Sequence, residues 1–595
     1  MKMNLRLSFS ALLASWALAA AAAPQPNVVV LLADDAGWGD TSHSGNRMVS
    51  TPQIDSLARD GVSFDRFFVC PLCAPTRAEF LTGRFYLRTG VRGVSTGHER
   101  LNADERTIAD AFRAAGYATG AFGKWHNGSQ WPYHPLARGF DEYYGYTAGH
   151  WGEYFDPPLE RNGKMERAKG YIVDACTDEA LGFIERNRKR PFFCYVPFTT
   201  PHSPWAVPQA YWQRFKDRPL EQRATQPRQE NPDQTRCALA MMENQDWNVG
   251  RILKKLDDLK LADNTIVLYF SDNGPNGARW NGGMKGVKGG TDEGSVRSVC
   301  FLRWPAALPK GKTVAEIAGA VDLLPTLTAL AGVARAGDKP LDGRDLTPLL
   351  LGQKTAWPAR TLFTAWGGKV SARTPQYRLG AAGALFDMLA DPGQTNDIAA
   401  ERSEVAAQLK QAAQAWRAEL YGPDADAKLE KGGRVDPRLL GVGYPEFPVT
   451  MLPARDGEPR GCVRRSGQAP NCSYFVNWVD KTGEMVWQID VQTAGDYDVV
   501  IDYTCPLADA GSQVELSFNG SRLAGRVAPG WDPPLETNQD TVPRAHGESQ
   551  MKAFRPLALG TVRLEKGSGP LVLRALEIPE ASVMDVRRVT LTLRR

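Results

Sequence analysis

The stretch Asn27-Val28-Val29-Val30-Leu31-Leu32-Ala33, followed at once by Asp34 and Asp35, decides the fold. An uncharged run of β-branched and aliphatic residues predicts a strand that is buried on both faces, as in the middle of a parallel sheet. The two aspartates then stand at the carboxyl end of this strand. Ligands of open α/β sheets bind at such ends.

Two further runs, 191–197 and 265–270, have the same buried-strand character. Helical patterns accompany them, at 51–61 and at 248–259. This alternation predicts an α/β fold with a mostly parallel central sheet sandwiched by helices. Because His202 and Asp272 follow the later two strands, we expect them at the same sheet edge as the two aspartates.

The length and the hydrophobic content predict more than one domain. The chain has 595 residues, 43% of them hydrophobic, and single cores stop growing at about 250 to 300 residues. Alternating runs late in the chain, separated by turns such as Asn519-Gly520, predict an antiparallel β-sandwich. We expect, in order, a signal peptide (1–23), a catalytic α/β domain (24–345), a small α+β subdomain (346–425), a linker (426–444) and a C-terminal β-sandwich (445–595).

The first residues predict export to the periplasm or the outside of the cell. Lys2 and Arg6 precede an apolar run that ends in alanines, so we expect cleavage near Ala23. A membrane anchor is the alternative, but the run is short for a span of about 20 residues. We expect no membrane span in the mature chain. The net charge of +4, from 71 basic and 67 acidic residues, gives no reason to expect a nucleic-acid partner.

The sharpest motif is Cys73-Ala74-Pro75-Thr76-Arg77, followed by Leu-Thr-Gly-Arg at 81–84. It resembles the signature of the type I, formylglycine-dependent sulfatases of the alkaline phosphatase superfamily. The resemblance extends from Pro26 to about Leu350 and implies that a maturase oxidises Cys73 to formylglycine. One hydroxyl of the hydrated aldehyde would attack sulfur, and the other would later expel the sulfate.

The resemblance also implies a metal site. Its ligands would be Asp34, Asp35, Asp272, Asn273 and an oxygen of residue 73. An all-oxygen site suits calcium better than zinc, with magnesium as the alternative. Taken singly, these residues would more often cap a helix or form a turn.

Four further positions match reacting groups of the family. Lys124 and His126 would act on the sulfate and on residue 73, and the i, i+2 spacing predicts that they share one face of an extended segment. His202 and Lys288 would hold sulfate oxygens and protonate the departing alcohol, although Lys285 is close enough to compete with Lys288. Arg77 would anchor residue 73 and the metal shell.

The cysteines and the remaining histidines are less informative. Nine cysteines leave eight if Cys73 is modified, and Cys462 and Cys472 flank a short loop as a candidate disulfide. His98 and His150 would lie in loops near the substrate, but a structural role is the default because neither belongs to a recognisable motif.

These observations predict a sulfatase that acts on sulfated carbohydrates or on aryl sulfates. The attached sandwich favours carbohydrates, by fold analogy only. Three alternatives remain: a phosphonate monoester or phosphodiester hydrolase of the same superfamily, a catalytically silent glycan-binding protein, and a zinc-dependent phosphatase.

Overall fold

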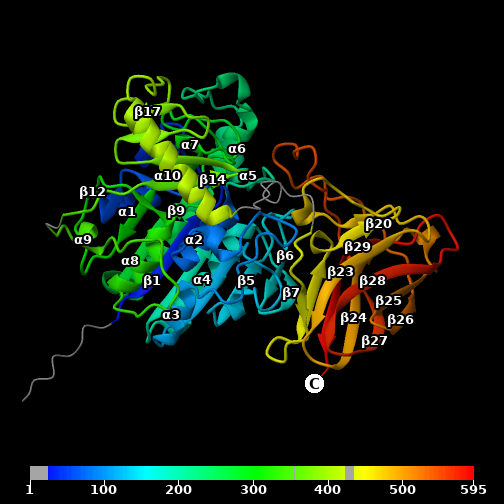
Figure 1. Ribbon diagram of the computed structural model, residues 1–595. Helices are drawn as coiled ribbons and strands as arrows, with labels where there is room; N and C mark the ends of the chain where they lie inside the picture. The colour runs from blue at the N-terminus through cyan, green and yellow to red at the C-terminus, as the bar shows by residue number, and fades with distance from the viewer. Residues whose placement is uncertain (1–24, 354–355, 423–434, 595) are drawn as a thin grey trace, which may run out of the picture.

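A computed structural model describes residues 25–353, 356–422 and 435–594. Figure 1 shows an α/β body beside a β-rich C-terminal part, with the C-terminus on the latter. The predicted fold class is confirmed: a mostly parallel central sheet between helices, a small α+β subdomain and a C-terminal sandwich of mainly antiparallel sheets.

The central sheet has ten strands within the described residues. Its middle strands β9, β1, β8, β4 and β5 run parallel to one another, whereas β11 and β6 pair antiparallel toward the edges. β1 lies at the centre and is buried throughout, as predicted. In spatial order the strands are β12 (Lys312–Val314), β2 (Val62–Phe64), β11 (Cys300–Arg303), β9 (Thr265–Ser271), β1 (Asn27–Ala33), β8 (Phe192–Pro197), β4 (Ala118–Lys124), β5 (Glu142–Tyr146), β6 (Pro158–Arg161) and β7 (Lys164–Arg167).

Helices cover both faces of this sheet. Alternate side chains of β1 point to opposite faces, so Val28 and Val30 enter one core and Val29 and Leu31 the other. The first core is closed by α2 (Cys73–Thr82), α3 (Ile108–Ala114) and α8 (Leu323–Leu330). The second is closed by α1 (Pro52–Arg59), α4 (Ile172–Asn187) and α6 (Pro232–Asp258).

Helix α6 is longer than predicted. The pattern at 248–259 marks only its last part, since α6 begins at Pro232. Polar residues buried in its middle hide the apolar period: Gln245 donates to the Thr200 carbonyl at 2.8 Å, and Asp246 accepts from the Ile54 amide at 2.8 Å. The prediction of α1 is confirmed.

The small subdomain follows the α/β body. In the described part of 346–425, four antiparallel strands pack against a long helix, and α9 (Thr347–Leu350) precedes them. The strands are β14 (Leu362–Trp366), β15 (Lys369–Arg373), β16 (Tyr377–Leu379) and β17 (Leu385–Asp387), and the helix is α10 (Ser403–Tyr421).

Two sheets with a shared apolar interior form the C-terminal sandwich, in which Trp487 of one sheet and Ile501 of the other are fully buried. The first contains β18 (Leu440–Val442), β20 (Glu458–Arg460), β23 (Glu484–Val491), β25 (Gln513–Phe518), β26 (Ser521–Arg526) and β28 (Gly567–Glu577). The second contains β19 (Val449–Pro453), β21 (Arg464–Arg465), β22 (Phe475–Val476), β24 (Gly495–Thr504), β27 (Arg555–Leu564) and β29 (Asp585–Leu593).

The predicted linker needs one correction. β18 lies inside 426–444 and pairs parallel with β23, so the end of this stretch belongs to the sandwich. Three residues are too short a run to show a strand period in the sequence. The other domain boundaries stay predictions.

Two further predictions concern the cysteines and the leader. All nine cysteines are free thiols in the structure, so the candidate disulfide between Cys462 and Cys472 is not formed. Cys462 lies against Asp480 of the sandwich, whereas the Cys472 thiol donates to the His150 carbonyl at 2.9 Å. The predicted signal peptide lies outside the described residues. None of the helices in 25–353, 356–422 and 435–594 is long and apolar enough to cross a bilayer.

A buried acid on α2 makes stability depend on pH. Burial raises the pKa of Glu79 to about 8 from an ordinary 4.5. The folded protein therefore binds a proton more tightly than the unfolded chain, and the stabilisation from this proton is complete below about pH 4.5 and lost as the pH rises through 8.

We predict that Glu79→Gln, which keeps the shape without the titration, gains stability relative to the unmodified protein as the pH rises from 5 to 8. The gain should approach about 1.4 kcal/mol per pH unit inside this window and level off above it. Urea denaturation at several pH values measures it. A difference between the two proteins that does not vary with pH would contradict the prediction.

Candidate active site

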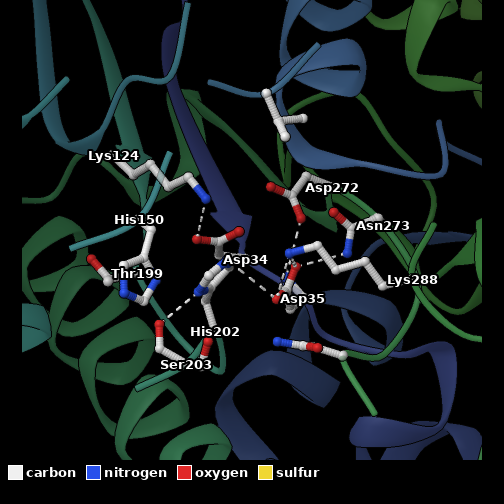
Figure 2. Close-up of polar contacts among 12 residues, drawn as sticks. Asp34, Asp35, Lys124, His150, Thr199, His202, Ser203, Asp272, Asn273 and Lys288 are labelled. Carbon is white, nitrogen blue, oxygen red and sulfur yellow. Dashed lines mark hydrogen bonds and ion pairs between the residues drawn. The ribbon is translucent and has the colours of Figure 1, made fainter. Parts of the chain in front are cut away.

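Side chains from four adjacent strands meet at the carboxyl edge of the central sheet. Asp34 and Asp35 follow β1, Asp272 follows β9, Lys124 ends β4, and His202 lies in the loop after β8. Because β9, β1, β8 and β4 are neighbours in the sheet, residues more than 230 positions apart in sequence come into contact here, as in the 3.1 Å hydrogen bond from the Asp35 amide to Asp272. Figure 2 shows their side chains converging.

Asp35 is the centre of one half of the site. Its carboxylate accepts from Lys288 Nζ at 2.6 Å and from Asn273 Nδ2 at 2.8 Å, and it lies 3.6 Å from His202 Nε2. Burial alone would raise the pKa of this carboxyl, but His202 and Lys288 lower the pKa below its ordinary range. Asp35 is therefore ionised and held by cationic and donor groups.

The backbone of Asp35 has an uncommon conformation, with φ of 69°. Aspartate tolerates this left-handed region better than most residues. Arg279 stabilises the turn, since its Nη2 donates to the Asp35 carbonyl at 2.9 Å while the same guanidinium pairs with buried Asp40 at 2.6 Å. Sequence reasoning missed both Arg279 and Asp40, because neither belongs to a motif that it used.

Asp34 is the centre of the other half. Lys124 Nζ donates to Asp34 Oδ2 at 2.7 Å, and Arg77 Nη2 lies 3.7 Å from Oδ1. Burial raises the pKa of the Asp34 carboxyl well above its ordinary range, although Lys124 opposes the shift. The protein side chains thus leave this carboxylate short of positive charge.

Arg77 joins helix α2 to the carboxylates. Helix α2 begins at Cys73, and Arg77 follows one turn later. Its guanidinium is fully buried, donates to Asp272 Oδ2 at 2.7 Å and donates to the Lys124 carbonyl at 2.8 Å. Burial lowers and Asp272 raises the pKa of Arg77, with a net increase, so this cation stays charged.

Cys73 stands at the positive N-terminal end of α2 and is only 3% exposed. Its Sγ and carboxylate oxygens of Asp34 and Asp272 all lie within 4.8 Å of one another. Residue 73 is therefore next to the carboxylates and to Arg77.

His126 differs from the prediction in its backbone. The strand ends at Lys124, and His126 has φ of 67°, so the two residues do not share one extended segment. The ring is fully buried, and its Nε2 lies 2.8 Å from the Val94 carbonyl. Since a carbonyl only accepts, Nε2 carries the hydrogen; Nδ1 is a buried nitrogen without a hydrogen-bond partner among the described residues. Burial and Lys124 lower the pKa of His126, which keeps the imidazole neutral.

His202, in the loop after β8, lies next to Asp35. Its Nδ1 donates to the Ser203 carbonyl at 2.6 Å, which leaves Nε2 facing Asp35. The His150 ring lies beside it, with centroids 5.3 Å apart. Burial lowers the pKa of both imidazoles, that of His150 to about 3. His98 instead lies 3.6 Å from Asp436, away from this group.

Of the two competing lysines, the structure brings only one to the carboxylates. Lys288 Nζ contacts Asp35, whereas Lys285 is exposed and offers its backbone carbonyl to the Gly294 amide. Contacts and short distances therefore bring together the residues proposed from the sequence other than His126, Lys285 and His98.

The donor set suits a hard divalent cation. Asp34 Oδ1 and Asn273 Oδ1 are buried oxygens that accept no hydrogen bond from the residues described in the structure. Unpaired buried acceptors are costly, and so is the charge deficit at Asp34. A cation held by Asp34, Asp35, Asp272 and Asn273 would bind the two unpaired oxygens and would offset the negative charge at Asp34. Among the described residues, His202 and Cys73 are the only ligands of the kind that zinc prefers that lie with these carboxylates, one in each group.

We predict that Arg77→Met destabilises the protein by about 3 to 5 kcal/mol, because it leaves Asp272 and Asp34 as uncompensated buried charges. The denaturant midpoint in a metal-free buffer measures this loss. The matched control is Arg59→Met, which breaks the exposed pair with Asp60 and should leave the midpoint nearly unchanged. Equal midpoints for the two variants would show that the buried pair is not needed for the fold.

Comparison with known proteins agrees with this geometry. The family model described as "Sulfatase" matches residues 26–333. N-acetylgalactosamine-6-sulfatase of Canis lupus familiaris is 33% identical over 372 residues, which cover 56% of this chain and 68% of that protein. Steryl-sulfatase of Mus musculus is 30% identical over 424 residues, which cover 55% and 65%.

Solved structures show the same likeness. Ps i-CgsB, determined in complex with k-i-k-neocarrahexaose, is 28% identical with a TM-score of 0.60, over 67% of this chain and 94% of that one. A phosphonate monoester hydrolase of Agrobacterium radiobacter shares the fold at 23% identity and a TM-score of 0.51.

Proposed function

The chain belongs to the sulfatase family, whose members are sulfuric ester hydrolases, and we propose that it removes sulfate from carbohydrate esters with residue 73 as the nucleophile. The observation that carries this proposal is the position of Cys73. Its Sγ lies among the carboxylates of Asp34 and Asp272, at the end of a helix whose Arg77 contacts both.

The groups that complete the site are a formylglycine derived from Cys73 and a divalent cation, for which we propose calcium, with magnesium as the alternative. The ligands are Asp34, Asp35, Asp272, Asn273 and an oxygen of residue 73, because these oxygens are hard and two of them lack partners among the described residues. Together these groups supply a hydroxyl nucleophile, a second hydroxyl that lets sulfate leave, and positive charge against the sulfate.

Lys124 and Lys288 bind the sulfate oxygens. Their ammonium groups contact Asp34 and Asp35 from two sides, so an anion placed over residue 73 would lie between them. Burial would lower the pKa of Lys288, but Asp35 raises it, and this lysine stays cationic. Cations aligned in advance stabilise the charge that develops on the leaving oxygen.

Two histidines move protons. Nδ1 of His126 is the basic nitrogen of a neutral ring whose Nε2 is already bonded to the Val94 carbonyl, so Nδ1 takes the proton from the second hydroxyl of residue 73. Nε2 of the neutral His202 ring carries no proton, because Nδ1 donates to the Ser203 carbonyl, so Nε2 passes to the departing alcohol a proton that it receives from cationic Lys288. Lys288 assists this transfer from the other side of Asp35.

Two relatives support a carbohydrate substrate. One is named for N-acetylgalactosamine 6-sulfate, and one was solved with a neocarrahexaose. We propose a sulfated saccharide as the substrate of this chain, with aryl sulfates as smaller alternatives. We also propose that the protein is exported, to the periplasm or outside the cell, and that a formylglycine-forming maturase acts on it during biogenesis.

We predict that Cys73→Ala abolishes sulfate release, since no other side chain in the site offers a geminal pair of hydroxyls. The protein is coexpressed with a maturase, and free sulfate is measured with an aryl sulfate and a panel of sulfated mono- and oligosaccharides. Mass analysis of the peptide that contains residue 73 reports the modification. Full activity in Cys73→Ala would overturn the proposed nucleophile.

The control separates loss of chemistry from loss of fold. Cys194→Ala removes a thiol that is equally buried, in β8, but lies in the sheet core away from the carboxylate edge. We expect it to retain turnover and aldehyde formation.

A further inference from the structure

One of the segments through which the C-terminal sandwich reaches the active site is the loop 536–551. Residues 536–551, between β26 and β27, cross to the α/β body, where Val542 is buried in the second core. The amides of Thr541 and Val542 donate to the Trp205 carbonyl at 2.8 and 3.1 Å. The 536–551 loop is thus docked on the chain segment that directly follows His202.

Arg544 holds this loop against the chain segment that follows His150. Its side chain is 2% exposed, donates to the Gly152 carbonyl at 2.9 Å and pairs with Asp540 at 2.8 Å. Gly152 lies two residues beyond His150. The loop is therefore clamped between the two segments that carry His150 and His202.

Glu548 is the side chain of this loop that lies next to Ser203 and His150. Its Oε1 accepts from Ser203 Oγ at 2.8 Å, and its Oε2 lies 3.5 Å from His150 Nε2. Oε2 is buried and accepts no hydrogen bond from the described part of the chain. The Glu548 side chain is 14% exposed, and the side chains of His202 and Lys288 are similarly exposed, at 12% and 16%. These three side chains keep a small share of surface beside a site that is otherwise closed.

A free acceptor in this position needs a donor. A carboxylate only accepts hydrogen bonds, and a buried oxygen without a partner costs free energy. His150 stands at 3.5 Å and lies between Glu548 and His202, where the alcohol part of a substrate would extend from the sulfate. The hydroxyl groups of a sugar are suitable donors.

We propose that Glu548 is a substrate-specificity residue: its partly exposed side chain turns Oε2 out of its buried position toward a bound sugar, and a hydroxyl of the sugar that bears the scissile sulfate donates to it, alongside His150. This rests on the proposed function and adds that the sandwich supplies part of the substrate site. The carboxylate favours saccharides with a free hydroxyl next to the sulfate. It repels a second sulfate or a carboxylate at that position.

The test compares Glu548→Gln with the unmodified enzyme on three probes: p-nitrophenyl sulfate, monosulfated monosaccharides, and disulfated forms of the best monosaccharide. Losing a hydrogen bond to a charged group costs about 1.5 to 3 kcal/mol, so we expect kcat/KM for the best monosulfated sugar to fall about 10- to 100-fold, mainly through KM. The kcat/KM for the aryl sulfate should stay unchanged, so the ratio of kcat/KM for the sugar to kcat/KM for the aryl sulfate should fall by the same factor. The ratio for disulfated to monosulfated sugar should rise, because the repulsion is gone.

The matched control is Glu580→Gln, an exposed carboxylate elsewhere in the sandwich, which should keep both ratios. If Glu548→Gln unfolds below the assay temperature, Glu548→Asp, which keeps the charge but shortens its reach, is compared in the same way. An equal loss on sugar and aryl sulfate, or no loss on sugar, overturns the specificity role. Sulfate release from the aryl probe but from no sugar also overturns it, whereas no release from any probe by the unmodified, matured enzyme instead defeats the proposed function.

Discussion

The structure depends on the compensation of buried negative charge at one edge of its central sheet. Asp34, Asp35 and Asp272 are fully buried, and bringing three carboxylates together would cost several kcal/mol each without partners. Arg77, Lys124 and Lys288 supply three cations. These cations leave one oxygen of Asp34 and one of Asn273 without a hydrogen-bond donor among the described residues. These two unpaired oxygens are the strongest physical reason for a bound divalent cation.

The same charge balance includes residue 73 at the start of α2. Arg77 is paired with Asp272, and α2 begins one turn earlier, so residue 73 lies beside the carboxylates of Asp34 and Asp272. Residue 73, the buried carboxylates and the cations paired with them are thus parts of one electrostatic unit. A change in any of them is expected to alter the others, and measured effects should not be additive.

Much of this could be predicted from the sequence, because buried parallel strands leave a plain signal. β1, β8 and β9 appear as continuous apolar runs, and the site residues stand directly after them. The sulfatase family and its chemistry, predicted from the motif around Cys73, are confirmed by the comparisons, which do not favour the alternative functions. The roles of the individual site residues stay predictions.

Other features were beyond sequence reasoning for physical reasons. The length of α6 was missed because its buried side is partly polar, and the conformation of His126 was missed because residue spacing does not report φ. Glu548 lies 346 positions after His202 and belongs to no motif, so only the docking of the 536–551 loop reveals it. Long-range contacts of this kind depend on how two domains pack, which local patterns do not encode.

The most direct test of the central claim is a crystal structure of the matured protein grown with calcium. The account predicts one ion within about 2.3 to 2.6 Å of oxygens from Asp34, Asp35, Asp272, Asn273 and residue 73, with two oxygens on the side-chain carbon of that residue. A site that stays free of metal at millimolar calcium, or an ion bound elsewhere beside an unmodified Cys73 thiol, would contradict it.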